Sequence, residues 1–285
     1  MQKKKLEKKL VDLEKFVRPY FKNYIKVNTD KCPDNVGKLS IDKSEEFLKR
    51  LFVRVAFEVG GVPGMENLEE GYEKFEEVLK NARTKKYNLH DIADFRKALV
   101  DIMSVAEGGN DIETIVKSLK KIKMYGQKTA ALFMKFLVKY SNFFNNADTK
   151  QLPVPVDRVI VRMTFDLGID KIVCLGNKEE IKKDLRKAYT KHKTSKGKGR
   201  EKLARKISPN YNPAVITIIN LIAAEIGNEK VIYDNLWVIG HLYHGAGKKE
   251  GHNLRKVQKA IEWSYLEGIQ LPNQCPLKAI CQHKK

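Results

Sequence analysis

The sequence lacks the long apolar segments of a membrane or secreted protein. Its longest apolar run, AVITIINLIAAEI at 214–226, has 13 residues and is interrupted by Asn220, which makes it too short to span a bilayer. The opening residues, MQKKKLEKKL, are basic, but no apolar stretch or cleavage site follows them, so we expect no signal peptide. We therefore expect a cytoplasmic protein without a membrane partner.

Acidic residues are also in short supply. The chain has 35 Asp and Glu against 55 Lys and Arg, which leaves a formal net charge of +20. Because Lys and Arg neutralise phosphates and release their counterions, this imbalance favours nucleic acid as the partner. A Lys/Glu-rich surface of the thermophile kind would explain abundant charge, but it would not explain the excess of one sign.

Half of the net charge lies in residues 181–206, which hold nine Lys and three Arg against one Asp and one Glu. The middle of this segment, KTSKGKG, lacks apolar periodicity. This predicts a mobile basic loop, or an insertion between helices, that lies along a phosphate backbone. A solvated loop with no partner is the alternative. The expected backbone contacts in this segment are Lys193, Lys196 and Lys198.

Strand-like alternation is scarce, whereas apolar residues recur every three or four positions in nearly every segment. This pattern predicts an all-α fold. No internal repeat and no long linker outside the basic segment is found, so we expect residues 1–285 to form one monomeric unit with two lobes. The expected helices are 47–59, 72–82, 89–106, 111–122, 126–144, 157–168, 213–226, 234–244 and 253–268.

Within this pattern, residues 111–144 predict a helix hairpin. Only three residues separate DIETIVKSLKKI from GQKTAALFMKF, so the chain must reverse across a turn centred on Gly126. Backbone N–H groups at the start of the second helix can bind a phosphate oxygen without reading base sequence. The expected backbone contacts of this hairpin are Lys123, Gly126 and Gln127.

Lys128 stands at the start of the otherwise apolar second helix of this hairpin. The positive end of the helix dipole and the apolar neighbours favour a neutral amine over an ammonium. A neutral amine is a nucleophile, and its attack on a sugar C1′ gives a Schiff base once the nucleobase has left. Taken alone, a surface lysine or a simple phosphate contact is the simpler interpretation.

Such chemistry needs an anion that faces the positive charge developing on the sugar ring. The segment LPVPVD ends on Asp157, and the pattern that follows predicts an N-cap position on the next helix. There the carboxylate is stabilised as an anion and fixed in direction. A purely structural cap is the alternative for Asp157.

Taken together, the two motifs resemble the helix-hairpin-helix, GPD superfamily of DNA glycosylases. GQK at 126–128 matches the Gly-x-Lys of the bifunctional branch, and PVPVD at 153–157 matches the family's Pro-Val-Asp helix start. The 29 positions between the lysine and the aspartate are most similar to the archaeal 8-oxoguanine DNA glycosylase group. One difference stands out, because the family hairpin reads Leu-Pro-Gly-Val-Gly where this chain has IKMYG at 122–126.

The resemblance, which covers residues 111–168, implies a DNA repair enzyme. Lys128 would be the Schiff-base nucleophile and Asp157 the catalytic carboxylate of a bifunctional N-glycosylase and abasic-site lyase. Such an enzyme excises a flipped 8-oxoguanine and then cleaves the strand by β-elimination. The implied active site lies in the cleft between the lobes, without a cofactor. The implied partner is double-stranded DNA with damaged bases, in the nucleoid of an archaeal or prokaryotic cell.

A base inside duplex DNA must be flipped into a pocket before an enzyme can act on it. The resemblance implies that this pocket takes residues from the hairpin's second helix and from the late segment YDNLWVIG. Packing inside the core is the alternative for the two aromatic candidates, and capping is the alternative for the aspartate. The candidates are Phe133, Lys135, Asp234 and Trp237.

Cysteine is scarce, and four scattered residues are too few for a disulfide framework. Some members of the family hold an iron-sulfur cluster with four C-terminal cysteines, but this tail has only two, so we expect no cluster. The histidines and tail cysteines match no standard zinc finger, and we interpret them as core or solvated residues rather than metal ligands. These residues are Cys32, Cys174, Cys275, Cys281, His241, His244, His252 and His283.

Two other functions stay open at this point. A glycosylase of the same fold would act on another damaged base if its pocket differed. A non-catalytic helix-hairpin-helix protein would use the hairpin and the basic segment only to hold the DNA backbone. Lys128 and Asp157 discriminate between these classes, because a protein that only binds DNA needs neither the amine nor the carboxylate.

Overall fold

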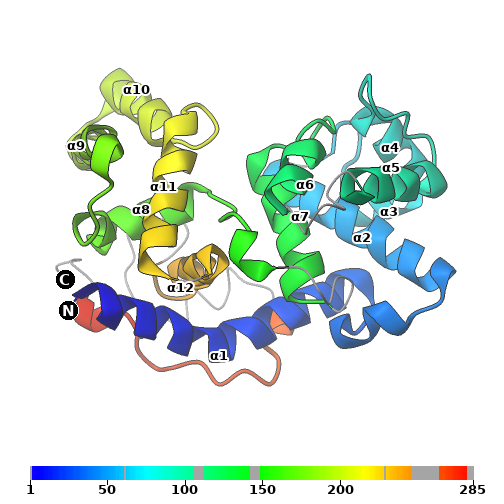
Figure 1. The fold of residues 1–285 in the computed structure, drawn as a ribbon, viewed down its shortest axis with the longest axis horizontal. Coiled ribbons are helices and arrows are strands. Elements are labelled where there is room, and N and C mark those ends of the chain that lie inside the picture. The colour runs from blue at the N-terminus through cyan, green and yellow to red at the C-terminus, as the bar shows by residue number, and fades with distance from the viewer. Residues whose placement is uncertain are drawn as a thin grey trace. The chain divides into compact units, whose positions relative to one another are not determined.

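The structure is a computed structural model that describes residues 2–60, 62–104, 112–141, 148–227, 229–244 and 263–280. Within these ranges it contains twelve α-helices, several short 3-10 turns and no strand, so the expected all-α class is confirmed (Figure 1). None of the described helices combines the length and the apolar character needed to cross a membrane.

The chain divides into two compact units. Unit 1 takes residues 1–17, 156–263 and 268–285, and unit 2 takes residues 18–155 and 264–267. The first division falls inside α1 (Gln2–Thr29), next to Pro19, which has no backbone N–H to donate to the helix. Each unit is described separately below.

Unit 2 is built on an aromatic core. Phe52 stacks on Tyr125 at a centroid separation of 4.5 Å and lies 4.5 Å from Phe95, and all three rings are buried. Large buried rings bring much apolar area out of water, so they fix the helices that carry them. The helices of this unit are α2 (Ile41–Gly60), α3 (Leu68–Glu73), α4 (Phe75–Ala82), α5 (Ile92–Ser104), α6 (Ile112–Leu119) and α7 (Gln127–Lys139).

Unit 1 packs its later helices around a core of Ile, Leu and Val side chains. One buried polar pair lies within it, because the hydroxyls of Thr164 and Tyr233 are 2.7 Å apart. The two oxygens satisfy each other, as buried polar groups must. The helices of this unit are α8 (Arg158–Asp166), α9 (Glu179–Thr194), α10 (Gly197–Ile207), α11 (Pro213–Ile226) and α12 (Asn235–His244).

Most of the expected helices are confirmed to within a few residues. The expected helix 72–82 is interrupted at Lys74, which ends α3 and precedes α4. The expected helix 126–144 ends at Lys139 in the structure, and residues 142–147 lie outside the described ranges. Of the expected helix 253–268, residues 253–262 lie outside the described ranges, and Trp263–Leu266 form a 3-10 turn.

The basic segment 181–206 differs from the expectation of a mobile loop. It forms most of α9 and α10, two helices in contact that are joined by only Ser195 and Lys196 (Figure 1). The missing apolar periodicity was misleading because a hairpin that projects its side chains into water needs few apolar positions. Only Lys182, Leu185, Tyr189 and Ile207 are buried along the two helices.

Candidate active site and nucleic-acid interface

The turn of the α6–α7 hairpin has its left-handed residue at Met124, with φ 75°. The sequence predicted a turn centred on Gly126, but Gly126 is the N-cap of α7 and has an extended backbone, with φ −74° and ψ −177°. Met124 thus adopts the left-handed backbone conformation that glycine adopts most easily. In the glycosylase hairpin that this segment resembles, the same position is a glycine. This conformation costs a residue with a Cβ roughly 1–2 kcal/mol.

Tyr125 fixes this turn to the core of unit 2. Its ring is buried on Phe52, and its hydroxyl donates to the Phe52 carbonyl oxygen at 2.9 Å. On the other side of Met124, the N–H of Lys123 donates to the carbonyl oxygen of Ala82 at 2.9 Å. Because both neighbours are held, the strained residue between them and the start of α7 are held as well.

Lys128 occupies the first turn of α7 and is half-buried. Every residue after it in the helix, from Thr129 to Lys139, is buried. Gly126 caps the helix without a side-chain hydrogen bond, and a Cβ built at this position would meet no atom within 4 Å. The backbone before Lys128 therefore leaves room for a ligand to approach, whereas the rest of α7 is packed in the core of unit 2.

The two other α7 candidates lie inside unit 2. Phe133 is completely buried among the rings of Phe52, Phe95 and Tyr125, and this packing accounts for an aromatic residue at the position without a substrate. Lys135 is also completely buried, with Nζ 3.5 Å from the centroid of the Phe21 ring. An ammonium over a ring face gains cation–π stabilisation, which increases when water is excluded.

Asp157 is the N-cap of α8, as predicted. Its Oδ1 accepts hydrogen bonds from the backbone N–H groups of Val159 at 2.8 Å and Ile160 at 2.9 Å. Its Oδ2 accepts a third hydrogen bond, from Nε1 of Trp237 at 2.9 Å. These three donors fix the direction of the side chain at the positive end of the α8 dipole.

Trp237 reaches Asp157 because α12 packs very closely on α8. A Cβ built at Gly240, one turn after Trp237, would lie 2.4 Å from Cγ1 of Val159 and 3.1 Å from Cγ of Met163. Only glycine allows this approach. The indole is half-buried, and its ring lies 4.1 Å from that of His241. The sequence had suggested core packing or base stacking for Trp237, and neither interpretation included its hydrogen bond to Asp157.

Asp234 lies directly before α12, as the last residue of a 3-10 turn, Lys230–Asp234, and it is buried. The next residue, Asn235, donates from Nδ2 to the carbonyl oxygen of Leu10 at 3.0 Å, which ties the start of α12 to α1. Asp157, Asp234 and Trp237 therefore all belong to unit 1. Lys128, Phe133 and Lys135 belong to unit 2.

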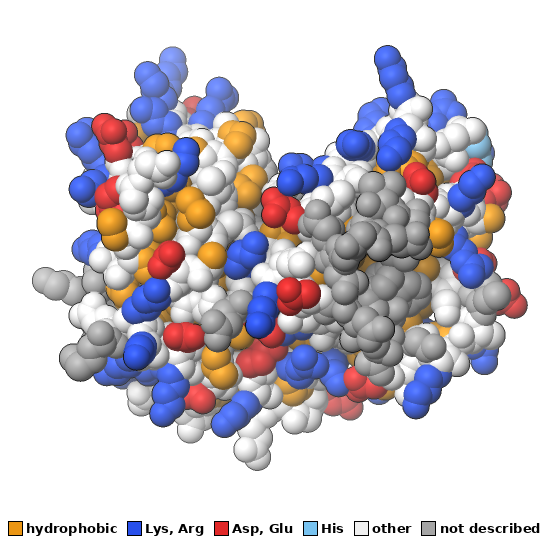
Figure 2. Space-filling view, in the orientation of Figure 1, with side chains coloured by type: hydrophobic (Ala, Val, Ile, Leu, Met, Phe, Trp, Pro, Cys, Tyr) orange, Lys and Arg blue, Asp and Glu red, His pale blue; other side chains and the backbone are white. Residues whose placement is uncertain are grey.

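The α9–α10 hairpin presents most of its cations to solvent. Ten of its twelve Lys and Arg side chains are exposed, and Figure 2 shows Lys and Arg gathered over these two helices. Burial, and then the charge of Arg200, lower the pKa of His192, so this histidine adds little charge at neutral pH. The exposed cations are Lys183, Lys187, Lys191, Lys193, Lys196, Lys198, Arg200, Lys202, Arg205 and Lys206.

Two of the hairpin's cations attach it to unit 1. Arg186 pairs with Asp170 through two nitrogens and also donates to the carbonyl oxygen of Phe165 at 2.7 Å. Lys193, a predicted backbone contact, is exposed but pairs with Asp166 at 2.8 Å. Bidentate Arg–carboxylate pairs fix geometry as well as charge. The hairpin is thus anchored at the end of α8 opposite to Asp157.

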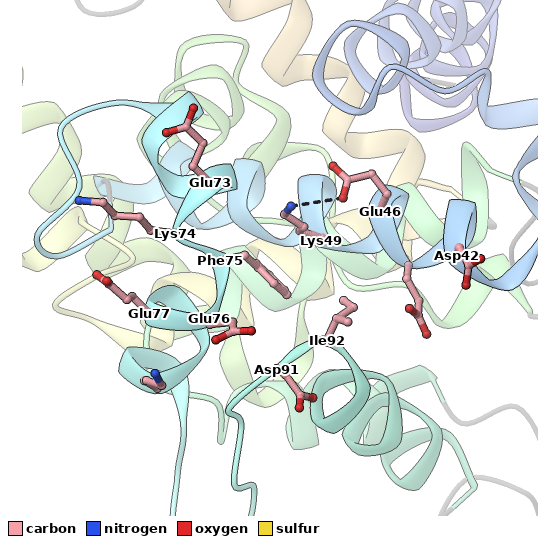
Figure 3. A pocket seen from close by; sticks show the side chains of 12 residues that line it. Asp42, Glu46, Lys49, Glu73, Lys74, Phe75, Glu76, Glu77, Asp91 and Ile92 are labelled. Atoms are coloured by element: carbon pink, nitrogen blue, oxygen red, sulfur yellow. Dashed lines mark ion pairs between the residues drawn. The ribbon is translucent and has the colours of Figure 1, made fainter.

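An acidic groove of about 560 Å³ lies in unit 2, between α2, α4 and the start of α5, and no motif had predicted it. Figure 3 shows Phe75 and Ile92 among its charged side chains, and Lys49 pairs there with Glu46 at 3.3 Å. Seven carboxylates against three lysines give it the opposite sign to that of a DNA-binding surface. The carboxylates belong to Asp42, Glu45, Glu46, Glu73, Glu76, Glu77 and Asp91.

The described residues contain no group of three or more His, Cys, Asp and Glu that could hold a metal ion. His244 and Cys275 are both buried in unit 1, while Cys32 and Cys174 are exposed. His252, Cys281 and His283 lie outside the described ranges.

Comparison with protein families, curated proteins and solved structures finds no match to this chain. The functional interpretation therefore depends on the residues and their surroundings. Two contacts were beyond sequence reasoning because they join distant positions: Trp237 with Asp157, and Arg186 with Asp170. The acidic groove did have a local signal, because residues 66–77 hold six Glu and one Lys.

Proposed function

We propose that this protein is a bifunctional DNA glycosylase and abasic-site lyase that excises an oxidised purine, 8-oxoguanine, from double-stranded DNA. Lys128 is the nucleophile and Asp157 is the carboxylate that stabilises the developing sugar cation. The α6–α7 turn and the α9–α10 hairpin hold the DNA backbone. The observation that carries this proposal is the environment of Asp157, which is more elaborate than a helix cap requires.

A capping aspartate needs only one oxygen for the backbone N–H groups. In this protein Oδ1 accepts both backbone hydrogen bonds, and Oδ2 is held separately by the Trp237 indole. A carboxylate fixed at both oxygens can stabilise a cation without first reorganising, which is the condition for electrostatic catalysis. Together with its partial exposure, this arrangement supports a role at the reacting sugar.

The proposed reaction balances with these two side chains. The neutral Lys128 amine bonds to C1′ as the glycosidic bond breaks, and the bonding pair leaves with the base, which takes up a proton. Ring opening leaves the C1′–O4′ bonding pair on O4′, which takes up a proton from water, and gives a protonated Schiff base at C1′. Loss of a proton from C2′ then expels the 3′ phosphate by β-elimination, and water finally releases the amine. Asp157 opposes the positive charge during the first step.

The basic hairpin supplies affinity that does not depend on base sequence. Its ten exposed cations suit phosphate neutralisation with counterion release. It is anchored at the far end of α8, whose nine residues span about 13 Å from Asp157. This offset supports contacts with backbone a few base pairs from the excised nucleotide, because duplex DNA rises about 3.4 Å per base pair.

The proposal is tested by borohydride trapping on a duplex that contains one 8-oxoguanine. Borohydride reduces the Schiff base to a stable amine, so the wild-type protein should give a covalent adduct with the DNA. Lys128→Gln should give none. The matched control is Lys120→Gln, which removes an exposed lysine directly after α6 and should keep trapping at the wild-type level. Equal trapping by Lys128→Gln and wild type would exclude Lys128 as the nucleophile.

The same assay separates the alternative functions. A glycosylase for another base would form no adduct with 8-oxoguanine but would form one with a different lesion in a panel of duplexes. A protein that only binds DNA would give no adduct with any lesion, while retaining salt-dependent affinity for undamaged DNA.

A further inference from the structure

One aromatic ring is exposed on the basic surface of unit 1. Tyr211 lies in the connection 208–212 between α10 and α11, and 71% of it is exposed. Among the described residues, the other large apolar side chains that are exposed are aliphatic, and their exposure ranges from 36% to 52%. Because a packed tyrosine ring removes much apolar area from water, a ring left this open contributes little to the core.

The connection holds this ring on an ordered turn. The backbone N–H groups of Tyr211 and Asn212 both donate to the carbonyl oxygen of Ser208, at 3.1 and 3.0 Å. The side chain of Asn212 bridges the two helices, because Nδ2 donates to the Lys206 carbonyl oxygen at 2.6 Å and Oδ1 accepts from the N–H of Ala214 at 3.1 Å. Binding a ligand at the ring therefore requires little further ordering of the backbone.

The surroundings of the ring favour a particular kind of ligand. Isolated exposed apolar residues are common on proteins and by themselves indicate no ligand. The guanidinium carbon of Arg205, however, lies 5.9 Å from the centroid of the Tyr211 ring, within the range of a cation–π contact. Lys202 and Lys206, which belong to the same helix α10, are exposed as well. Proteins bind unpaired nucleotides with this combination, because the ring stacks on the base while the cations neutralise phosphates.

An unpaired base suits this surface better than a paired one. Inside a duplex, both faces of a base are already stacked on its neighbours, so an exposed ring gains contact only with a base that has left the stack. Contacts to the phosphates of a duplex need cations but no aromatic ring. The cations of α9 and α10 therefore account for the affinity of the hairpin for any DNA, whereas Tyr211 adds a contact that depends on an unpaired base.

We propose that Tyr211 and Arg205 form a stacking site for an unpaired DNA base, so that the surface around the α9–α10 hairpin binds single-stranded DNA as well as the duplex backbone. The neighbouring cations of α10 bind phosphates of the same strand. The site rests on the proposed function for the identity of its partner, DNA, but it needs neither Lys128 nor Asp157.

The test compares two undamaged probes, a short fluorescein-labelled oligothymidine and a blunt duplex, by fluorescence anisotropy. Tyr211→Ala should bind the single strand roughly 5- to 100-fold more weakly than wild type, the effect of one lost base stack, and should bind the duplex within about twofold of wild type. Tyr211→Trp should bind the single strand as wild type does, because an indole also stacks. Tyr211→Leu should bind it as weakly as Tyr211→Ala, because leucine is apolar but has no π face.

The matched control is Leu221→Ala, which truncates another exposed apolar side chain, on α11, and should leave both affinities unchanged. A second measurement locates the contact in the wild-type protein. Irradiation with an oligomer of 5-iododeoxyuridine should cross-link a base to Tyr211, and tandem mass spectrometry of the digested adduct identifies the residue.

Three results would overturn the proposal: wild-type single-strand affinity in Tyr211→Ala or in Tyr211→Leu, an equal loss of affinity for both probes in Tyr211→Ala, or cross-links at other residues only. Failure of the proposed function gives a different result. In that case no lesion yields a borohydride adduct, while Tyr211→Ala still loses affinity for the single strand. If adducts form but Tyr211→Ala binds the single strand as wild type does, the stacking site is excluded and the enzyme assignment stands.

Discussion

The molecule contains two short-turn helix hairpins that are both expected to touch DNA, and they are built in opposite ways. In α7, eleven of the thirteen residues are buried. In α10, only Ile207 among eleven residues is buried. The first hairpin is therefore part of a core and the second is a projection that is held by ion pairs at its base.

This difference determines how much the substitution of a single lysine should affect function in each hairpin. The α9–α10 hairpin has ten exposed cations, and we expect the group to act through its summed charge rather than through any one of them. In the first turn of α7, Lys128 is the half-buried residue at the point where the helix enters the core. We therefore expect single substitutions to matter in the α6–α7 hairpin, and only multiple substitutions to matter in the α9–α10 hairpin.

The largest effect after that of Lys128 is expected at Asp157, the second of the two proposed catalytic groups. Asparagine caps a helix about as well as aspartate, so Asp157→Asn should fold normally. Removing the negative charge should slow base excision by roughly 10²- to 10³-fold, as the loss of a preorganised electrostatic group does. Single-turnover excision of 8-oxoguanine measures this rate, and binding to the same duplex is expected to stay within a few-fold of wild type.

Trp237→Phe provides the comparison for that variant. It removes the hydrogen bond to Oδ2 but leaves the carboxylate, so the expected loss is about tenfold, the size of one charge-assisted hydrogen bond. If Asp157→Asn excised the base at the wild-type rate, the carboxylate would be only a cap. If Trp237→Phe were as slow as Asp157→Asn, the indole would be acting on the substrate rather than on Asp157.

A smaller effect is expected from neutralising part of the basic hairpin. Replacing Lys196, Lys198 and Lys202 with glutamine should lower the slope of log affinity against log salt by about three, one for each lost phosphate contact. The borohydride adduct should still form at low salt. The control replaces Lys80, Lys85 and Lys97, exposed lysines of unit 2, with glutamine and makes the same change in net charge. Equal slopes in the two triple variants would show that the hairpin does not contact DNA.

The smallest expected effect comes from a substitution that changes no charge. It tests whether the backbone of the α6–α7 turn contributes to DNA affinity. A Cβ at Gly126 would meet no atom within 4 Å, a Cβ at Gly227 would meet only the Glu229 carbonyl oxygen at 3.6 Å, and neither glycine has a positive φ, so alanine fits at both positions. Gly126→Ala should weaken DNA binding a few-fold, because the methyl group occupies the space of a phosphate that contacts the α7 backbone. Gly227→Ala, at the end of α11, should leave binding unchanged. Thermal unfolding confirms that both variants are folded, and unchanged affinity in Gly126→Ala would remove the α7 turn from the interface.

The sequence predicted the parts of the site that depend on local pattern. The N-cap position of Asp157 followed from the residues around it, because a proline-stiffened segment before an apolar helix leaves few alternatives. The reversal of the chain before Lys128 followed in the same way. The conformation of Met124 did not, because no local rule places a methionine at φ 75°. It is the fixed neighbours, Lys123 and Tyr125, that impose it.

Contacts between residues far apart in sequence could not be predicted, because they depend on how the helices pack rather than on local pattern. Trp237 meets Asp157 only because a missing side chain at Gly240 lets α12 approach α8, and no periodicity encodes that approach. The α9–α10 hairpin was missed as helix because its stability depends on ion pairs of Arg186 and Lys193 with carboxylates elsewhere in unit 1. Long-range partners of this kind appear only in the folded chain.

The most direct measurement of the central claim is the position of the covalent bond. Wild-type protein is trapped with borohydride on an 8-oxoguanine duplex, the DNA and the protein are digested, and the modified peptide is sequenced by tandem mass spectrometry. The proposed mechanism predicts that the reduced sugar remnant is attached to Nζ of Lys128. A remnant on any other lysine, or on the amino terminus, would contradict it.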